Sequence, residues 1–210
     1  FEGELPHFRA VAEGLTKRSQ IPLSVRFAFG NYTDILHWME RGSVDAAVIG
    51  PGMHAVVQDR PELKKNWRYI ANEYHSYANP GVDCFTNLKA EHSSIAELRA
   101  RVARQELEIL VVDPFSVSGT LLPLLGLLRE GINLTPRDLR FTYSHSNSIR
   151  ILGDTSIPRL ACVWRGSIED EKVIAKFQRV HIPSIDVLKV PSGVVMVREG
   201  SRAAELLPEL

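Results

Sequence analysis

A cluster of small hydroxyl residues carries the clearest chemical signal in the sequence. One turn within DPFSVSGTLLP, residues 113–123, holds Ser116, Ser118, Gly119 and Thr120. A turn that opens a helix exposes N–H groups with a partial positive charge, and such groups bind anions readily. Serine hydroxyls add further donors, and a glycine lets the backbone approach a ligand closely. The same hydroxyls can instead cap the helix, and the sequence leaves these two interpretations open.

Two other residues could take part in the same chemistry. His145 follows the strand-like stretch LRFTY, and its imidazole could donate to an oxyanion. We expect this effect to be larger at mildly acidic pH, where the ring would be charged. Tyr32 follows the strand-like stretch IPLSVRFAFG, and its hydroxyl could reach a ligand. The ordinary alternatives are a surface loop for His145 and packing at a lobe edge for Tyr32.

Strand-like and helix-like stretches alternate along the chain, which predicts an α/β fold with mostly parallel sheets flanked by helices. The stretch EILVVD has no polar alternation, as expected of a parallel strand that is buried on both faces. Ligands of such sheets bind beyond the carboxyl ends of the strands, where the turn and His145 lie. The predicted strands cover residues 21–30, 44–50, 67–74, 82–87, 108–113, 139–144, 159–164 and 193–198. The predicted helices cover residues 7–19, 31–43, 53–64, 93–103, 120–130, 146–154, 169–177 and 201–210.

The pattern restarts after the break at Asn79, Pro80 and Gly81, which predicts two lobes. We expect the last predicted strand and helix to belong to the first lobe. We therefore predict that lobe 1 covers residues 1–77 and 183–210. Lobe 2 then covers residues 78–182.

The composition excludes several classes of function. The chain has 210 residues, 44% of them hydrophobic, which is enough for a substantial core. Lys+Arg and Asp+Glu both number 25, and this balance argues against a nucleic-acid partner. The 7 histidines are scattered without metal-ligand spacing, and no phosphate-binding glycine motif is present. We therefore predict no metal and no cofactor.

The cysteines and the first residues bear on the compartment. Cys84 and Cys162 both fall in apolar, strand-like runs, so buried free thiols are the preferred interpretation and a disulfide stays open. The opening FEGELPHF has neither a basic start nor an apolar core, so we expect a removed signal or a start inside a longer protein. The apolar stretch LLPLLGLL is too short to span a bilayer.

Three spans together resemble the phosphate/phosphite/phosphonate-binding family of periplasmic solute-binding proteins, over about residues 20–165. The family pattern of a tyrosine, a helix and then Gly-x-x-Asp-x-Ala-x-x-Gly-Pro is matched by Tyr32, Gly42, Asp45, Ala47, Gly50 and Pro51. The pattern Asp-Pro-x-Ser-x-Ser-Gly-x-x-x-Pro is matched by Asp113, Pro114, Ser116, Ser118, Gly119 and Pro123. The Ser-His pair that opens the next helix in the family is matched by Ser144 and His145.

The resemblance implies a two-lobed type II periplasmic binding fold with a small oxyanion in the cleft, and lobes that close by a hinge near 74–80 and 176–185. It implies an ABC importer receptor, or the sensor domain of a larger signalling protein, so a permease or a fused signalling domain is the expected partner. A periplasmic or extracytoplasmic location follows, although the sequence leaves a cytoplasmic one open. The implied ligand-binding residues are Tyr32 from lobe 1 and Ser116, Val117, Ser118, Gly119, Thr120 and His145 from lobe 2.

The sequence departs from the family pattern at two places. We expect the family's first strand of lobe 1 to be missing from this chain. The family's phosphonate receptors have an acidic residue in the strand after the histidine helix, to meet an amino group, where this chain has Arg159 and Leu160. This departure favours phosphate, phosphite or a methylphosphonate-like ligand over an aminophosphonate.

Two alternative functions stay open at this stage. The effector-binding domain of a LysR-type transcription regulator shares the fold, and a small hydrolase could use Ser116 and His145. The hydrolase is disfavoured because Ser116 is not in a G-x-S-x-G elbow and Asp113 adjoins the serine instead of orienting the histidine. We therefore predict that the protein is not an enzyme.

Overall fold

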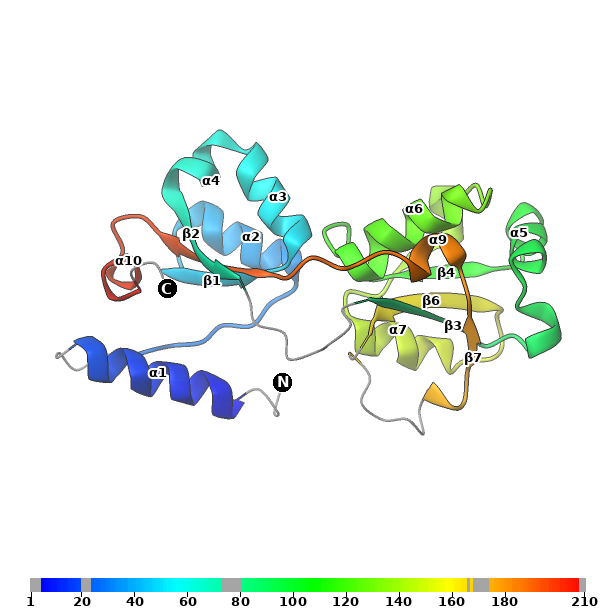
Figure 1. Cartoon of the computed structure of the whole chain (residues 1–210), viewed down its shortest axis with the longest axis horizontal. Coiled ribbons are helices and arrows are strands. Elements are labelled where there is room, and N and C mark those ends of the chain that lie inside the picture. The colour runs from blue at the N-terminus through cyan, green and yellow to red at the C-terminus, as the bar shows by residue number, and fades with distance from the viewer. Residues whose placement is uncertain (1–4, 20–23, 73–80, 166, 168–173, 208–210) are drawn as a thin grey trace. The chain divides into compact units, whose positions relative to one another are not determined.

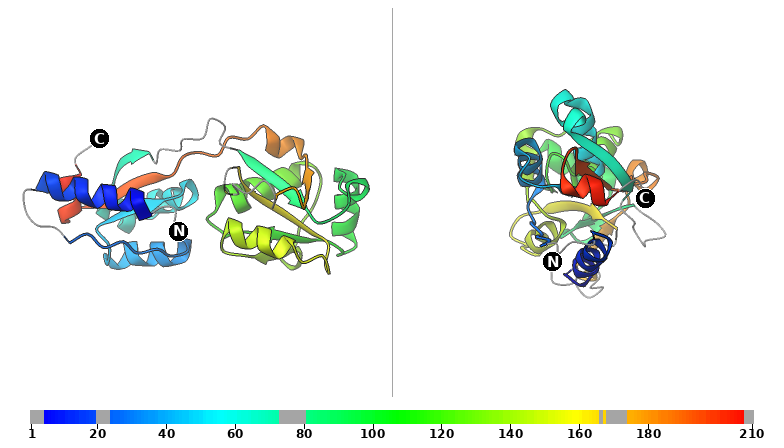
Figure 2. Two further views of the ribbon diagram at one scale, coloured as in Figure 1. Left: turned by 90° about the horizontal axis from the view of Figure 1, so that it is seen from below. Right: turned by 90° about the vertical axis from the view of Figure 1, so that its left-hand side faces the viewer.

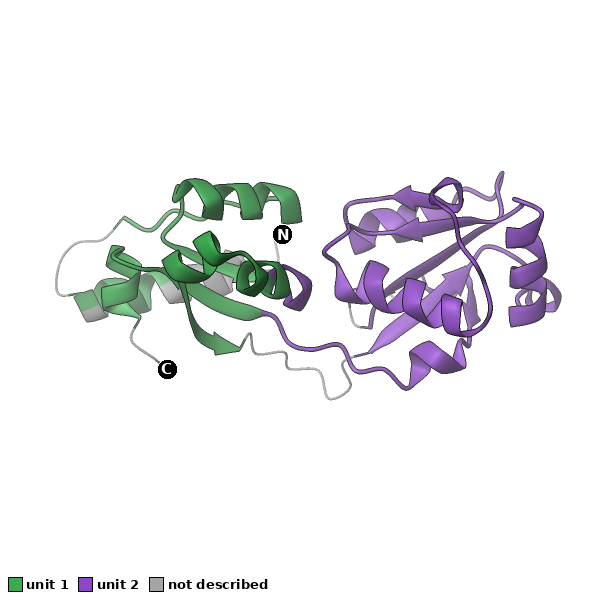
Figure 3. Ribbon diagram, turned by 90° about the horizontal axis from the view of Figure 1, so that it is seen from above, with its two compact units in different colours: residues 1–49, 54–73, 194–210 green, residues 50–53, 74–193 purple. Residues whose placement is uncertain are grey.

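The computed structural model describes residues 5–19, 24–72, 81–165, 167 and 174–207. The chain divides into two compact units (Figure 3). Unit 1 comprises Phe1–Ile49, His54–Glu73 and Val194–Leu210, and unit 2 comprises Gly50–Met53 and Tyr74–Gly193. The chain re-enters unit 1 after residue 193, whereas the sequence placed this boundary at 182/183. The difference arises because Ile182 and Ile185 are buried in the core of unit 2.

Unit 1 contains a three-stranded sheet in the order β1-β8-β2. Its strands are β1 (Ala46–Ile49), β2 (Trp67–Asn72) and β8 (Val194–Arg198), and both outer strands run antiparallel to β8. The helices of this unit are α1 (Leu5–Ser19), α2 (Tyr32–Arg41), α3 (Pro51–Asp59, whose first three residues are assigned to unit 2), α4 (Pro61–Asn66) and α10 (Arg202–Leu206). Helix α1 lies beside α10 (Figures 1 and 2).

Helix α2 shows how local sequence sets the element boundaries. Asn31 forms a capping box, in which its side chain accepts from the Asp34 N–H and the Asp34 carboxylate accepts from the Asn31 N–H. Gly42 ends the helix in the left-handed region with a φ of 62°. The buried face carries Leu36 and Met39, and the Trp67 indole donates to the Met39 carbonyl at 3.2 Å.

The predicted strand over residues 21–30 is not a strand in this structure. Residues 24–31 have no regular secondary structure, and residues 20–23 lie outside the described residues. The apolar alternation of IPLSVRFAFG was read as a strand, but a strand also needs a neighbour with which its backbone can pair. Within the described residues the sheet of unit 1 consists of β1, β8 and β2, and residues 24–31 belong to neither sheet.

Unit 2 contains a five-stranded sheet in the order β5-β4-β6-β3-β7. Its strands are β3 (Val82–Thr86), β4 (Glu108–Val111), β5 (Leu139–Phe141), β6 (Arg159–Trp164) and β7 (Gln178–Val180). Its helices are α5 (Ile95–Ala103), α6 (Leu122–Arg129), α7 (His145–Leu152) and α9 (Pro183–Asp186), and its shorter turns are η1 (Ala90–His92), η2 (Val117–Leu121) and η3 (Pro136–Asp138). Helix α7 lies on the opposite side of the sheet from α6 and α9 (Figures 1 and 2).

Strand pairing corrects one detail of the predicted fold class. The strands β5, β4 and β6 are parallel, but β3 is antiparallel to both β6 and β7. In unit 1 each pair includes β8, which returns from unit 2 and runs against both neighbours. The sheets are therefore mixed rather than mostly parallel, because the strands that follow a crossing between units enter in the opposite direction.

Two apolar clusters cover the two faces of the unit 2 sheet. Ile109 and Val111 of β4 lie in the cluster that includes residues of α5, α6 and α9, while Leu110 lies in the cluster with α7. Burial on both faces explains why β4 reads as an unbroken apolar run, as the sequence predicted. Helix α6 approaches α9 closely, since a Cβ at Gly126 would lie 2.1 Å from Ile185 Cγ1.

The two cysteines form a disulfide, so the prediction of free thiols is wrong. Cys84 of β3 and Cys162 of β6 are directly opposite partners in the antiparallel register, and their Cα atoms are 4.0 Å apart. Both side chains face the same core cluster. The pairing depends on the register of two strands that are 78 residues apart, which the sequence pattern does not show.

No helix in the described part of the chain is long and apolar enough to cross a membrane.

Candidate ligand-binding site

Ser116 caps the turn that follows β4. Its Oγ accepts a hydrogen bond from the Gly119 N–H at 3.1 Å, and its carbonyl accepts from the Leu121 N–H at 3.0 Å. The side chain is fully buried. The structure therefore gives Ser116 the capping role that the sequence left open, and the Gly119 N–H is engaged within the turn.

Thr120 ties the turn back to the end of β4. Its Oγ1 accepts from the N–H groups of Val112 and Asp113, at 3.1 and 3.2 Å, and it is almost completely buried. The Asp113 carboxylate accepts from the Phe115 N–H at 3.0 Å. The side chains of Asp113, Ser116 and Thr120 therefore all accept hydrogen bonds within the turn and stabilise it.

The structure brings Ser118 and His145 together. The Oγ of Ser118 lies 3.4 Å from the Nε2 of His145, and the side chains come from η2 and from the start of α7. The ring also lies against the turn, because a Cβ at Gly119 would be 2.9 Å from His145 Cε1 and 2.3 Å from Val112 Cγ2. Gly119 is therefore required for this approach, because any larger residue would meet Val112 and the ring.

A third residue sets the tautomer of His145. The backbone N–H of Trp164, at the end of β6, donates to His145 Nδ1 at 3.4 Å. A neutral imidazole that accepts at Nδ1 carries its proton on Nε2, and this tautomer is inferred from the hydrogen bonds. The Nε2–H then faces Ser118 as a donor.

Burial keeps the imidazole of His145 neutral. It lowers the pKa of His145 from its ordinary value of 6.5 to about 4. The ring is therefore uncharged at mildly acidic pH in the ligand-free protein, which argues against the expected imidazolium. What the ring offers to a ligand is a neutral N–H donor.

Hydrogen bonds around the start of α7 hold His145 in place. Ser144 caps the helix, with its Oγ accepting from the Asn147 N–H at 3.1 Å. The hydroxyls of Thr142 and Ser148 are 2.7 Å apart, and both side chains are buried. The Tyr143 N–H donates to the Val112 carbonyl at 2.7 Å, so the loop before α7 is bound to the same strand end as the turn. The site is thus built on the carboxyl ends of β4 and β6 and on the loop that follows β5.

The remaining predicted residues have different positions. Val117 begins η2 and is partly buried. Tyr32 begins α2 in unit 1 and is partly buried. The structure groups Ser118, Gly119 and His145 within unit 2, and the role of Tyr32 stays a prediction.

The predicted departure from the family pattern lies at the start of β6. Arg159 starts β6, is almost completely buried, and donates to the Glu108 carboxylate at 2.6 Å. Trp164 is the β6 residue at the site. Its position next to His145 depends on a contact between residues 19 apart, and the only sequence signal was an aromatic residue at the end of a predicted strand.

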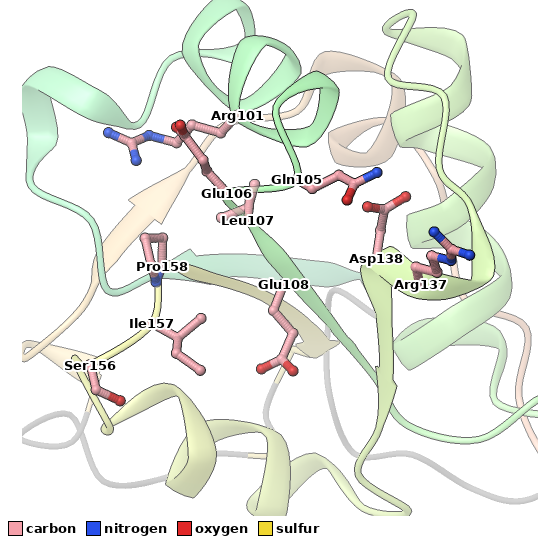
Figure 4. A pocket seen from close by; sticks show the side chains of 10 residues that line it. All are labelled: Arg101, Gln105, Glu106, Leu107, Glu108, Arg137, Asp138, Ser156, Ile157 and Pro158. Atoms are coloured by element: carbon pink, nitrogen blue, oxygen red, sulfur yellow. The ribbon is translucent and has the colours of Figure 1, made fainter.

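A hollow of about 550 Å³ in unit 2 lies at the amino ends of β4 and β6, opposite the ends that carry the Ser118–His145 pair (Figure 4). It is lined at the starts of β4 and β6 by Glu108 and Pro158, and by side chains of neighbouring turns. Its Glu108 is paired with Arg159 and lies 3.6 Å from Arg140. The hollow is therefore separate from the Ser118–His145 pair. Within the part of the chain that the structure describes, no group of three or more His, Cys, Asp or Glu could hold a metal ion.

Comparison with known proteins identifies the family. Residues 5–154 match the family of ABC transporter, phosphonate, periplasmic substrate-binding proteins. The chain belongs to this family. No curated protein is similar enough in sequence to match it.

Solved structures share the fold at low identity. PhnD1 from Prochlorococcus marinus, in complex with methylphosphonate, has a TM-score of 0.68 and 14% identity, and the match covers 99% of this chain and 76% of that one. A binding protein component of an ABC phosphonate transporter from Pseudomonas aeruginosa has a TM-score of 0.67 and 15% identity, covering 92% and 63%. A Xanthomonas citri protein bound to ATP has a TM-score of 0.62 and 19% identity, covering 92% and 71%. The predicted two-lobed type II periplasmic binding fold is confirmed, and the chain spans less than two thirds of the Pseudomonas protein.

Proposed function

We propose that this protein is the receptor of an ABC importer and binds a small phosphorus oxyanion at the Ser118–His145 pair. One observation carries the proposal, namely that the Nε2–H of a neutral His145 faces the Ser118 hydroxyl at the carboxyl ends of β4 and β6. An anion that enters between these groups receives a hydrogen bond from each. The 3.4 Å separation is long for a direct bond between the two side chains, so little is lost when a ligand replaces it.

Neutral donors suit the binding of an oxyanion in a partly buried site. Hydrogen bonds to a charged acceptor contribute about 1.5–3 kcal/mol each, roughly twice the value for neutral pairs. They also avoid the desolvation cost of a buried cation. Low local polarity strengthens both bonds and is the same property that lowers the pKa of His145. The donor set is therefore adapted to hold an anion without a permanent positive charge.

The capping residues of the turn support the site indirectly. Ser116 and Thr120 use their side chains to shape η2, and through it they set the position of Ser118. The family resemblance suggests the backbone N–H groups of residues 117–120 as further donors, of which the Gly119 N–H already donates to Ser116 Oγ. A periplasmic location for this chain is part of the proposal, and the disulfide supports it because disulfides persist in oxidising compartments.

The geometry does not favour a hydrolase. The partner of His145 in the structure is Ser118 and not Ser116, whose Oγ caps the turn and is fully buried. A serine nucleophile needs an exposed hydroxyl in contact with its base. Membership of the transporter family likewise favours binding over regulation of transcription.

Isothermal titration calorimetry with phosphate, phosphite, methylphosphonate and sulfate tests this function. We expect the wild-type protein to bind at least one phosphorus oxyanion, and both Ser118→Ala and His145→Ala to bind it at least tenfold more weakly. The control is Ser94→Ala, which removes the cap of α5 in the same unit and should leave the affinity unchanged. Absence of binding to every phosphorus oxyanion, or equal affinity in the Ser118 variant, would rule out the proposed site.

A further inference from the structure

A second hollow in unit 2 lies along α7, with a volume of about 560 Å³. Residues of α7 and its C-terminal cap line it at the spacing of side chains that share one helix face, namely Ser146, Ile149, Arg150 and Gly153. Residues that follow β3 and residues that precede β7 complete the lining. Neither Ser118 nor His145 lines this hollow. It is therefore distinct from the site of the proposed function.

The charged side chains among the described lining residues are both cations. Arg150 of α7 and Lys176, shortly before β7, are exposed, and neither has an ion-pair partner among the described residues. No carboxylate belongs to the lining that the structure describes. Two cations that line one hollow repel each other, and an anion between them converts this repulsion into attraction. The charge of the hollow therefore favours an anionic ligand.

A buried hydroxyl without a partner is an independent observation at the same hollow. Ser167 belongs to the lining, and its Oγ is buried without a hydrogen-bond partner in the described part of the chain. Buried polar groups are nearly always paired, so this hydroxyl lacks an acceptor that a ligand can bring. Rotation about χ1 turns the hydroxyl without any change in the backbone. The side chain of Asn87, in contrast, already donates to two backbone carbonyls and accepts from an N–H.

The floor of the hollow is apolar. Ile149 is almost completely buried in the cluster between α7 and the sheet, and Phe177 packs against that cluster. A Cβ at Gly153 would lie 4.0 Å from Phe177 Cζ, so the aromatic ring lies against the C-terminal end of α7. An apolar floor below exposed cations suits a ligand that has a carbon body and an anionic end.

We propose that this hollow is a second binding site, and that it takes a small organic phosphate. The phosphate group lies between Arg150 and Lys176, where it also offers Ser167 an acceptor. The carbon part packs against Ile149 and Phe177. The assignment goes beyond the proposed function and does not depend on it, because it uses neither of the two donors of that site.

The test is titration calorimetry with phenyl phosphate on the double variant Ser118→Ala, His145→Ala, which lacks both donors of the oxyanion site. We expect this variant to bind phenyl phosphate, and to bind it at least about tenfold more weakly once Arg150→Gln and Lys176→Gln are added. The matched control is Arg129→Gln, which removes an exposed cation of α6 on the opposite side of the sheet (Figure 1) and should leave the affinity unchanged.

Two further measurements locate the ligand. Backbone amide spectra of the double variant should show shifts at Gly153 and Phe177 with phenyl phosphate, and smaller shifts with inorganic phosphate, which has no carbon part. The affinity for phenyl phosphate should also fall as salt is added, because the cations are exposed. No binding to the double variant, or equal affinity after Arg150→Gln and Lys176→Gln, overturns the assignment.

A last variant tests whether the chain itself supplies the anion. Glu169, Asp170 and Glu171 are close to the hollow in sequence and lie outside the described residues. The variant Glu169→Gln, Asp170→Asn, Glu171→Gln should bind phenyl phosphate about as tightly as the protein that keeps these carboxylates. Binding that appears only in this variant assigns the two cations to the chain's own acidic residues, and the proposal is then wrong. Titration of the wild type with methylphosphonate tests the proposed function separately.

Discussion

The Nε2 atom of His145 lies 3.4 Å from the Oγ of Ser118, although the two residues are 27 positions apart in the chain. The contact joins the turn after β4 to the helix after β5, and the Trp164 N–H fixes the ring from the other side. Three neighbouring strands of one sheet therefore position one donor pair. The predictions below follow from this arrangement.

Replacement of Ser118 by alanine should weaken oxyanion binding by about 10–100-fold, because it removes one charge-assisted hydrogen bond of about 1.5–3 kcal/mol. The fold should be nearly unaffected, since the contact of the Ser118 side chain with His145 is long, at 3.4 Å. Calorimetric titration gives the affinity, and urea denaturation gives the stability. A large loss of stability together with the loss of affinity would show that Ser118 has a structural role instead.

Replacement of Ser116 by alanine should have the opposite pattern. It leaves the Gly119 N–H without its acceptor in a buried turn, and we expect a loss of about 1–2 kcal/mol in the free energy of unfolding. Any loss of affinity should be indirect and should be reduced by Ser116→Thr or Ser116→Asp, which can also cap. The measurement is urea denaturation of the three variants. If Ser116→Ala is as stable as the wild type, the capping interpretation is wrong.

The low pKa of His145 predicts a pH-dependent stability. The folded pKa of about 4 is below the ordinary value of 6.5, so the unfolded chain binds more protons between these pH values. The contribution is complete above pH 6.5 and is lost as the pH falls toward 4, with a total of roughly 3 kcal/mol. Unfolding free energies at pH 7.5, 6 and 5 should decrease in this order. His145→Asn should flatten the decrease, while His92→Asn, at an exposed position in η1, should not.

Replacement of Gly119 by alanine should disrupt the site. The added methyl group would lie 2.3 Å from Val112 Cγ2 and 2.9 Å from His145 Cε1, so either the turn or the ring must move. We expect at least a tenfold loss of affinity and a lower melting temperature. Gly14→Ala on α1 is the matched control, because nothing lies within 4 Å of its added carbon. It should leave affinity unchanged and raise helix stability slightly. If Gly119→Ala binds the oxyanion as tightly as the wild type does, the His145 ring is not part of the binding site.

The disulfide should contribute substantially to stability. It closes a separation of 78 residues, for which loop-closure entropy gives about 4 kcal/mol. The double variant Cys84→Ala, Cys162→Ala should therefore unfold at a markedly lower urea concentration. Maleimide labelling of the denatured wild-type protein should find free thiols only after reduction. Two reactive thiols without reductant would contradict the pairing.

Much of unit 2 follows from local sequence. The unbroken apolar run of β4 indicated burial on both faces, and the predicted helix over residues 93–103 agrees with α5, which Ser94 caps. The turn of hydroxyl residues was correctly placed between β4 and a helix. These features depend on residues within a few positions of one another, so their physical causes are visible in the sequence. The resemblance of the motif then indicated the family.

Other features needed partners that are distant in the chain. The atoms near each hydroxyl decide that Ser116 caps the turn and that Ser118 faces His145. Cys84 meets Cys162 because the strand register places them opposite each other. Residues 24–31 have no regular secondary structure, which their apolar alternation does not decide because a strand is defined by its pairing with another segment.

The sequence by itself determined the donor types, their order along the chain and the elements that carry them. Only the tertiary structure decided that His145 is neutral and that Trp164, rather than Arg159, is the β6 residue at the site. The physical reason is that desolvation and side-chain contact depend on everything that surrounds a group. A linear sequence specifies the neighbours along the chain, whereas packing specifies the neighbours in space.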